Sequence, residues 1–404
     1  MRRIAWAMLL VFAFTVPWEY SLDLGAPLGN ISRIAGLLLL IATVPAILQT
    51  GRIRKPGLMQ WLVLALFLWF CISCFWTIDE TATFERIRTF AQVMMAVWIV
   101  WELAESPKDL RNLMRAYVAG SLVLAVLTFA NFASLGADGQ ARFAAEGQDP
   151  NDMARFLNLG FPLAVLLLRS EQRWWGRALA IGYLPIGFAS VLLTASRSGF
   201  VNASIALAGC VVLLVRARRR AILGGLAAIA VSALVPWLIV PYATILRIGT
   251  IPEQLMGGDL NQRINIWVAG WQAFVHAPLV GSGAGSFVAA SRLARIDTAH
   301  NTALALAVEG GLVALALGFA IVASATHSLL RLGGVTRVGL GTALLVGIVS
   351  SMAATVEGSR STWLVLALIS IAGRLAVQAP AAMATQFETK FHAIAPSQTA
   401  ESVV

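Results

Sequence analysis

The chain has 404 residues, of which 58% are hydrophobic and 12% are charged, and its formal net charge is +10. A soluble domain carries about 25% charged residues, so this composition excludes an ordinary water-exposed surface and predicts that lipid covers much of the chain. The cations stand in short clusters between apolar runs, which is typical of the cytoplasmic loops of a membrane protein and argues against a basic groove for nucleic acid.

Apolar segments recur along the chain, each close to the length that a membrane-spanning helix needs, about 20 mostly apolar residues. We therefore expect an all-α polytopic membrane protein with about twelve transmembrane helices in a domain of residues 1–378. No A-x-A-like cleavage site follows the basic start, so the first segment is predicted to be a retained span and not a removed signal peptide. In chain order, the predicted spans are 4–22, 31–49, 58–76, 84–103, 113–134, 153–169, 177–194, 199–215, 221–241, 301–324, 338–356 and 361–378.

The positions of the cations predict which side of the membrane each loop faces. With the N-terminus inside, every basic cluster falls in the cytoplasm and both termini are cytoplasmic. Residues 379–404 are then a disordered cytoplasmic tail, and residues 242–300 form a long outer loop of the kind that is usually functional. The clusters are Arg2-Arg3, Arg52/Arg54/Lys55, Lys108/Arg111/Arg115, Arg169/Arg173/Arg177, Arg216/Arg218/Arg219/Arg220 and Arg331/Arg337.

The outer loop contains a helical pattern, RINIWVAGWQAFVHAP, at 263–278. Trp267, Gly270, Trp271 and Phe274 recur in it at three- and four-residue spacing. This spacing predicts a helix with an apolar face that lies on the membrane or on the bundle.

Several conspicuous residues are assigned structural roles. Cys71, Cys74 and Cys210 lie in apolar spans, where small thiols usually pack. The glycine-rich segment 281–285 lacks the preceding strand and following Lys-Ser/Thr of a phosphate loop, so it is interpreted as a tight return toward the bundle. Glu309, inside the span 301–324, faces away from His300 and is expected to pair with another buried polar group.

Three outward residues are candidates for chemistry. Arg197, in the turn Ala195-Ser196-Arg197-Ser198-Gly199, needs a partner or a ligand at a helix boundary, or else snorkels to the interface. Arg263 begins the loop helix, where free amides favour an anion, although a solvated surface role is the alternative. His300, followed by Asn301, stands where the loop re-enters the membrane, and imidazole suits proton transfer near neutral pH, although a lone histidine is more often structural.

A fourth outward feature is the polar segment 147–152, which Arg155 follows at the start of a span. Asp149, Asn151 and Asp152 are expected to cap the next helix. Two close carboxylates also suggest a divalent ion, but no histidine or third acid stands near them. We therefore predict no metal site here.

Taken in order, four segments resemble the bacterial O-antigen ligase family, within the ligase/polymerase superfamily of membrane glycosyltransferases. They are DPNDMARFLNLGFPLAVLLL (149–168), LLTASRSGF (192–200), RINIWVAGWQAFVHAPLVGSGAGSF (263–287) and AHNTALALAVEGGLVAL (299–315). Their order, and the long outer loop between the second and the fourth segment, match the family across most of the chain.

The resemblance implies a metal-independent transfer, without a cofactor, on the periplasmic face of the bacterial inner membrane. A glycan carried on undecaprenyl pyrophosphate would move to a sugar hydroxyl of lipid A–core. The family's essential histidine and arginines fall on His300, the general base, and on Arg197 and Arg263, which would clamp the diphosphate. Direct displacement would invert the anomeric carbon. Candidate supporting residues are Ser196, Asn301, Asn151 and Arg155.

Two alternatives stay open. The same motifs occur in O-antigen polymerases and protein O-oligosaccharyltransferases, so the acceptor is not fixed by the resemblance. The alternative from a different class is a multispan transporter or flippase for an anionic lipid. That function predicts charges near the bilayer midplane and paired broken helices, and the sequence indicates neither.

Overall fold

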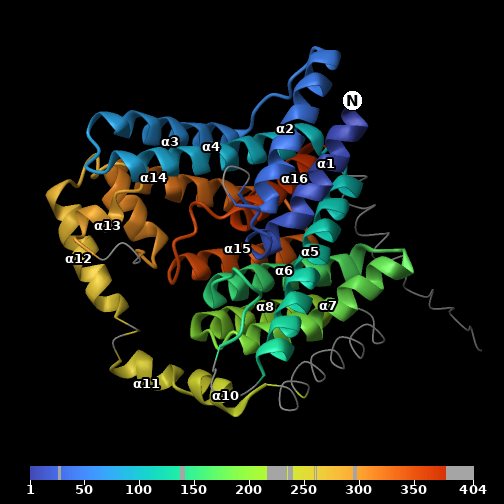
Figure 1. The fold of residues 1–404 in the computed structure, drawn as a ribbon. Helices are drawn as coiled ribbons and strands as arrows, with labels where there is room; N and C mark the ends of the chain where they lie inside the picture. Colours follow the sequence, from blue (N-terminus) through green and yellow to red (C-terminus); the bar gives the residue numbers. More distant parts are fainter. Residues whose placement is uncertain are drawn as a thin grey trace, which may run out of the picture.

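The protein is described by a computed structural model that covers residues 1–25, 29–136, 142–215, 234, 240–258, 260, 262–293 and 298–378. Figure 1 shows its long helices as one bundle, with α12 and α13 on the left and α11 and α10 below. The helices are α1 (Arg2–Thr15), η1 (Val16–Ser21), α2 (Ile31–Thr50), α3 (Leu58–Ile72), η2 (Ser73–Phe75), α4 (Glu80–Leu103), α5 (Pro107–Leu135), α6 (Pro150–Ser170), α7 (Trp174–Leu193), α8 (Arg197–Val215), α10 (Tyr242–Gly249), α11 (Ile251–Met256), α12 (Arg263–His276), α13 (Phe287–Ala290), α14 (Thr302–Leu330), α15 (Gly334–Ser351) and α16 (Arg360–Gln378).

Within the described residues, 10 helices are long and apolar enough to cross a membrane. They coincide with predicted spans, so the all-α polytopic membrane fold is confirmed. The predicted span 84–103 lies in α4, a helix of 24 residues that is more polar because its first turns carry Glu80, Glu85, Arg86 and Arg88. The predicted tail 379–404 and nearly all of the predicted span 221–241 lie outside the described residues.

Helix α6 is the central helix of the bundle. Every residue from Met153 to Leu167 is buried, and α5, α7, α8 and α15 all pack against it. A helix that is buried on all sides is mostly apolar; the polar residues in this buried stretch are Arg155 and Asn158. Pro150 stands at its first position, where the missing N–H of proline costs no hydrogen bond. The N-terminus of α6 is therefore a fixed point in the fold.

Helix α14 is broken at Gly311, whose φ of 64° is left-handed. Glycine suits this position, because a Cβ there would collide with the carbonyl of Leu279. Residues 278–285 cross the break: Leu312 N–H donates to Pro278 O at 2.8 Å, and Ser282 N–H donates to Val308 O at 2.8 Å. The sequence indicated no broken helix, so the expectation of an unbroken span is wrong here. The break is tolerated because this loop satisfies the backbone groups that it releases. The segment 281–285 returns to the bundle, as predicted.

A buried ion-pair network supports the break. Arg86 of α4 donates to Glu309 Oε1 at 3.0 Å and to Glu357 Oε1 at 2.5 Å, and Gly285 N–H donates to Glu309 Oε2 at 2.7 Å. The exposed fraction of the side chain is 20% for Arg86 and 2% and 3% for the two carboxylates. The prediction that Glu309 pairs with a buried polar group is confirmed. The network joins α4, α14 and the segment before α16.

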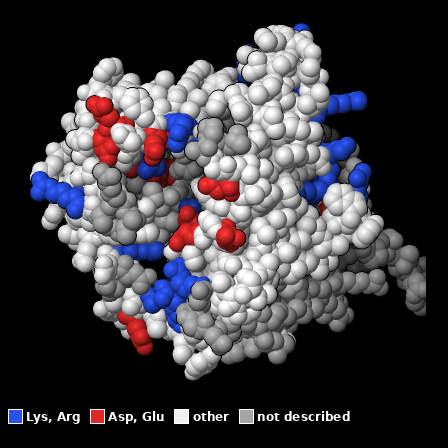
Figure 2. All heavy atoms as spheres, in the orientation of Figure 1, with Lys and Arg blue, Asp and Glu red and all other residues white. Residues whose placement is uncertain are grey.

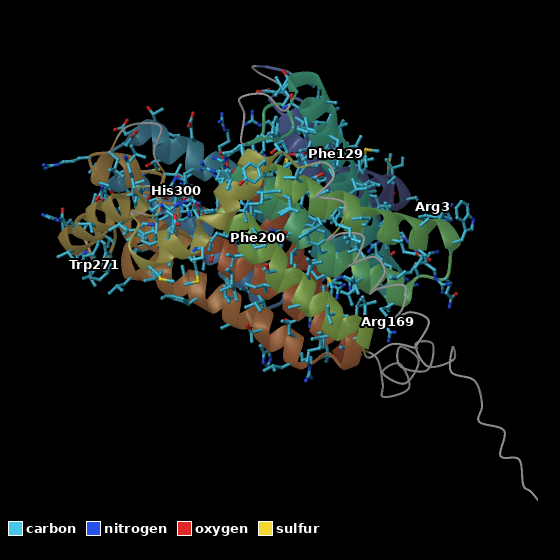
Figure 3. The ribbon with its side chains drawn as sticks, turned by 90° about the horizontal axis from the view of Figure 1, so that it is seen from below. Arg3, Phe129, Arg169, Phe200, Trp271 and His300 are labelled. Carbon is cyan, nitrogen blue, oxygen red and sulfur yellow. The ribbon has the colours of Figure 1, made fainter. Side chains whose placement is uncertain are left out.

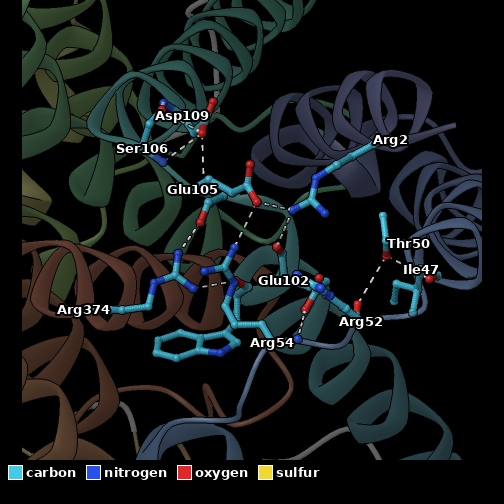
Figure 4. Close-up of polar contacts among 12 residues, drawn as sticks. Arg2, Ile47, Thr50, Arg52, Arg54, Glu102, Glu105, Ser106, Asp109 and Arg374 are labelled. Atoms are coloured by element: carbon cyan, nitrogen blue, oxygen red, sulfur yellow. Dashed lines mark hydrogen bonds and ion pairs between the residues drawn. The ribbon is translucent and has the colours of Figure 1, made fainter. Parts of the chain in front are cut away.

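The two ends of the bundle differ in their charged residues. Arg3 and Arg169 lie at one end, and His300 and Trp271 lie at the other (Figure 3). At the Arg3 end, Arg2 and Arg54 both bind Glu105 Oε1, at 2.6 Å and 3.1 Å, and Figure 4 shows these contacts beside Arg374. Members of three of the predicted cytoplasmic basic clusters thus lie at the end away from His300. That the Arg3 end faces the cytoplasm stays a prediction.

Replacing Arg86 with methionine should destabilise the protein. It would leave two buried carboxylates without their cation, and removing one partner of a buried pair costs about 3–5 kcal/mol. The matched control is Arg88→Met, because Arg88 is exposed on the same helix. Thermal unfolding in detergent should show a clear loss for Arg86→Met and almost none for Arg88→Met. Equal unfolding temperatures would contradict the structural role of the network.

Candidate active site

The N-terminus of α6 is held by its cap and by two neighbouring segments. Asp149 Oδ1 accepts the N–H groups of Asn151 at 2.8 Å and Asp152 at 3.2 Å, so its predicted capping role is confirmed. The side chain of Asn151 has a different role from the predicted cap. Its Oδ1 accepts from Arg142 Nη2 at 3.1 Å and from Ser196 Oγ at 2.9 Å. Asn151 therefore joins the segment before α6 to the turn before α8.

The turn before α8 places Arg197. Ala195 has a left-handed φ of 46°, and Ser196 Oγ accepts the N–H of Gly199 at 3.1 Å, so the chain reverses tightly into the helix. Ala195 and Ser196 are 1% and 2% exposed. Arg197 is the first residue of α8, and its Nε donates to Arg247 O at 3.4 Å. The turn therefore directs Arg197 toward α10.

The positive charges of three arginines act on the guanidinium group of Arg142, and we call the four residues the arginine cluster: Arg142, Arg197, Arg247 and Arg263. Burial lowers the pKa of Arg142; the charges of the other three arginines lower this pKa further, and the carboxylate of Asp149 opposes them. Burial also lowers the pKa of Arg263, and Asp149 again acts against the shift. Among the described residues, Arg142, Arg247 and Arg263 form no ion pair. Such a cluster suits a multiply charged anion.

Arg155 lies one helical turn after Asn151 along α6. It is 5% exposed and pairs with Asp152 at 3.0 Å. Its guanidinium also lies 5.0 Å from the ring centroid of Phe156. Its Nε and Nη1 make no hydrogen bond to any described residue. Arg155 thus adds buried positive charge below the N-terminus of α6.

His300 stands directly before the first half of α14. Asn301 caps that helix by accepting the N–H of Leu304 at 3.0 Å, so the structure gives this candidate supporting residue a positioning role. Thr302 Oγ1 accepts the N–H of Val356 at 2.9 Å and ties the helix start to the segment before α16. His300 itself is half-buried and has a left-handed φ of 45°, a conformation that costs a non-glycine residue about 1–3 kcal/mol.

Helix α12 presents apolar residues on two faces. Trp267 and Phe274 pack toward α14 with the buried Gly270, which confirms that one apolar face lies on the bundle. Trp271 is 59% exposed and points away from that contact. Contact of this second face with lipid stays a prediction.

The face between the α12–α13 side and the bundle is hollowed, and charged side chains of both signs surround the hollow (Figure 2). Among the described residues, no group of three or more His, Cys, Asp or Glu side chains is placed to hold a metal ion. Metal independence is a statement about the reaction, and it stays a prediction.

Comparison with known protein families gives one match within this region. A family described as O-antigen ligase matches residues 182–319. This segment belongs to the O-antigen ligase family. The O-antigen ligase segment begins in α7 and ends in α14, and it contains Arg197, Arg263 and His300. A comparison with curated proteins gave no match. The family's members are glycosyltransferase-like membrane enzymes of the ligase/polymerase superfamily.

The structure brings Arg197 and Arg263 into one cluster and adds two residues that the sequence analysis missed, Arg142 and Arg247. A signal for both existed, because each is an arginine in a segment predicted to face outward. Their proximity depends on the packing of α6, α8 and α10, which no local pattern specifies. The chemical roles of Arg197, Arg263 and His300 stay predictions.

The charge balance of the cluster gives a direct test of anion binding. Asp149→Asn keeps the cap of α6, because asparagine caps as well as aspartate does, but removes the carboxylate that faces the arginines. Affinity for inorganic pyrophosphate should rise about two- to fivefold, the range for a partly exposed charge pair. Isothermal titration calorimetry measures it, with Glu146→Gln in the same loop as the control. Weaker binding by Asp149→Asn would contradict this assignment.

Proposed function

We propose that the protein is an O-antigen ligase. It transfers a glycan from undecaprenyl pyrophosphate to a sugar hydroxyl of lipid A–core on the periplasmic face of the bacterial inner membrane. The observation that carries this proposal is the arginine cluster inside and beside the O-antigen ligase segment. A lipid diphosphate supplies several negative charges, and guanidinium groups bind phosphate oxygens in pairs.

Arg197 and Arg263 clamp the diphosphate in this proposal, and Arg142 and Arg247 complete its surroundings. When the bond between the anomeric carbon and the diphosphate oxygen breaks, negative charge grows on the leaving group. Fixed cations stabilise that charge with little reorganisation, the task that Mg²⁺ performs in other phosphate-transfer sites. The polyprenyl chain lies between the membrane helices, and the segment 242–300 covers the sugar.

His300 is the general base. It takes the proton from the acceptor hydroxyl as the hydroxyl oxygen attacks the anomeric carbon, a contribution of about 10²–10⁴-fold in rate. The attack and the departure of the diphosphate occur on opposite faces of the carbon, so the product has the inverted configuration. The placement of His300 at the start of α14, at the end of the bundle away from Arg3, supports this role.

The nearest alternative is a polymerase that joins repeat units on the same lipid carrier, and a protein O-oligosaccharyltransferase is a third member of this class. The deciding assay supplies purified protein with labelled lipid-linked glycan, with and without lipid A–core. A ligase transfers label only when lipid A–core is present. Label that grows into longer lipid-linked chains without it identifies a polymerase.

A transporter or flippase of an anionic lipid is the alternative from another class. The break in α14 is the kind of feature that transporters use, but the chain's own 278–285 loop fills it. Movement of labelled lipid-linked glycan across proteoliposomes without covalent transfer would favour this alternative.

Replacing His300 with alanine should abolish transfer and leave donor binding largely intact. The expected loss is about 10²–10⁴-fold in the rate of transfer, since the general base is gone and the arginine cluster remains. Arg197→Ala should also weaken donor binding, by about ten- to hundredfold, because a hydrogen bond to a charged group is lost. Rates and donor dissociation constants of the purified variants provide both measurements.

Two controls separate chemistry from folding. His300→Asn should be as inactive as His300→Ala, although asparagine tolerates the left-handed backbone at this position. His276→Ala, on the exposed face of α12, should transfer at the rate of the unmodified protein. Full ligation by His300→Ala would exclude His300 as the base.

The proposed transfer should survive metal removal. The arginines supply permanent positive charge, so activity in excess EDTA should equal activity in added Mg²⁺. The assay is the ligation reaction before and after chelation and dialysis. Loss of activity in EDTA with recovery in Mg²⁺ would show that the arginine cluster does not replace a metal.

A further inference from the structure

Trp267 connects the arginine cluster to the histidine. This indole lies on α12, one helical turn after Arg263 and on the same helix face. Its Nε1 donates a hydrogen bond to the backbone carbonyl of Ala299 at 3.1 Å. Ala299 is the residue directly before His300 and is 2% exposed. One side chain of α12 thus contacts the backbone of the residue beside the base.

The acceptor of this bond belongs to the peptide unit that leads into His300. The carbonyl of Ala299 and the N–H of His300 belong to one planar peptide unit, so fixing the carbonyl fixes that plane. The left-handed φ of 45° at His300 is a rotation about a bond in the same unit. A strained backbone conformation of this kind persists only where surrounding contacts hold it.

The surroundings of the bond are apolar and well packed. Trp267 packs against a cluster that includes the buried Ile266, Phe287 and Ala299. The hydrogen bond is part-buried, so water competes for the indole N–H and the carbonyl less than it would at the surface. The contact is therefore a defined link between α12 and the start of α14.

We infer that Trp267 is a positioning residue for His300. It holds the Ala299–His300 peptide in the orientation that directs the imidazole toward the acceptor hydroxyl, and it ties that orientation to the helix that begins with Arg263. This inference rests on the proposed function. The helix that contacts the donor diphosphate thereby also holds the base.

The test compares two tryptophans whose indole N–H donates to a backbone carbonyl, one just before α14 and one within it. Trp69 Nε1 donates to Gly310 O at 2.8 Å, at the break in α14, ten residues beyond His300. There Ser282 and Gly283 also bond to the helix backbone, so no single bond sets the local structure. Trp69→Phe and Trp267→Phe each remove one indole–carbonyl bond, and they should lower the unfolding temperature by similar amounts.

Only Trp267→Phe should change catalysis. Its kcat should fall about three- to tenfold, the range for loss of one hydrogen bond, and its KM for the donor should stay within about twofold. Trp69→Phe and the exposed Trp271→Phe should retain the kcat of the unmodified protein. A kcat that falls equally in Trp69→Phe and Trp267→Phe, in proportion to their stability, would reduce Trp267 to a structural role.

A second readout does not require transfer. The rate at which diethyl pyrocarbonate modifies His300, followed by mass spectrometry, should rise about threefold in Trp267→Phe, because one hydrogen bond fewer restrains the peptide. His276 is the internal reference and should react equally in both proteins. An unchanged rate at His300 overturns the inference. If the modification rate of His300 rises in Trp267→Phe but His300→Ala still ligates normally, Trp267 keeps its positioning role. The proposed function of His300 is then rejected.

Discussion

Repulsion among the guanidinium groups of the arginine cluster is the constraint that the fold must meet at the His300 end of the bundle. The arginine cluster gathers four guanidinium groups, with Asp149 as the carboxylate that opposes them in the electrostatics of Arg142. The fold holds this arrangement through neutral acceptors: Arg142 donates to Thr194 O at 3.3 Å and to Asn151, and Arg197 donates to Arg247 O. Neutral acceptors fix a cation without cancelling its charge. The cluster is therefore preorganised for an anion from outside the chain.

Two groups of elements meet at this site. The first is built on α6, which is buried along its length and carries Asp149 and Asn151 at its fixed N-terminus. The second combines α12, α13 and the first half of α14, and the loop across the break at Gly311 holds it to the bundle. The ion pairs of Arg86 with Glu309 and Glu357 anchor the same half of α14. The break thus creates a short helical segment whose start, at His300, is independently fixed.

The sequence was sufficient for the fold class. It also singled out three candidate site residues, whose chemical roles stay predictions. Apolar length and clustered cations predicted the spans, and the residues Arg197, Arg263 and His300 stood out because polar residues at helix boundaries need partners. Arg142 and Arg247 were missed because their importance comes from packing between distant segments. The local sequence pattern correctly predicted that Asp149 caps α6, because a helix cap depends on residues within one turn. It failed for Asn151, whose partners lie 9 and 45 residues away.

The break in α14 shows the same limit. Gly310 and Gly311 were visible in the sequence, but glycine is tolerated inside spans, so the pair alone does not predict a break. What makes the break stable is the set of hydrogen bonds from residues 278–285, which lie before α14 in the chain and return to it in space. Likewise, the sequence indicated that Glu309 needs a partner but could not identify Arg86, 223 positions earlier. Long-range pairing is decided by the packed bundle.

The central claim is that Arg197, Arg263 and His300 act together on the outer side of the membrane. Cysteine accessibility in intact cells tests it most directly, in a background from which Cys71, Cys74 and Cys210 have been removed. A membrane-impermeant maleimide should label Glu146→Cys and Gln262→Cys, which lie beside the arginine cluster. It should label Lys108→Cys and Arg331→Cys only after the cells are opened. Labelling of Glu146→Cys without Gln262→Cys would place the two parts of the site on opposite sides and contradict the account.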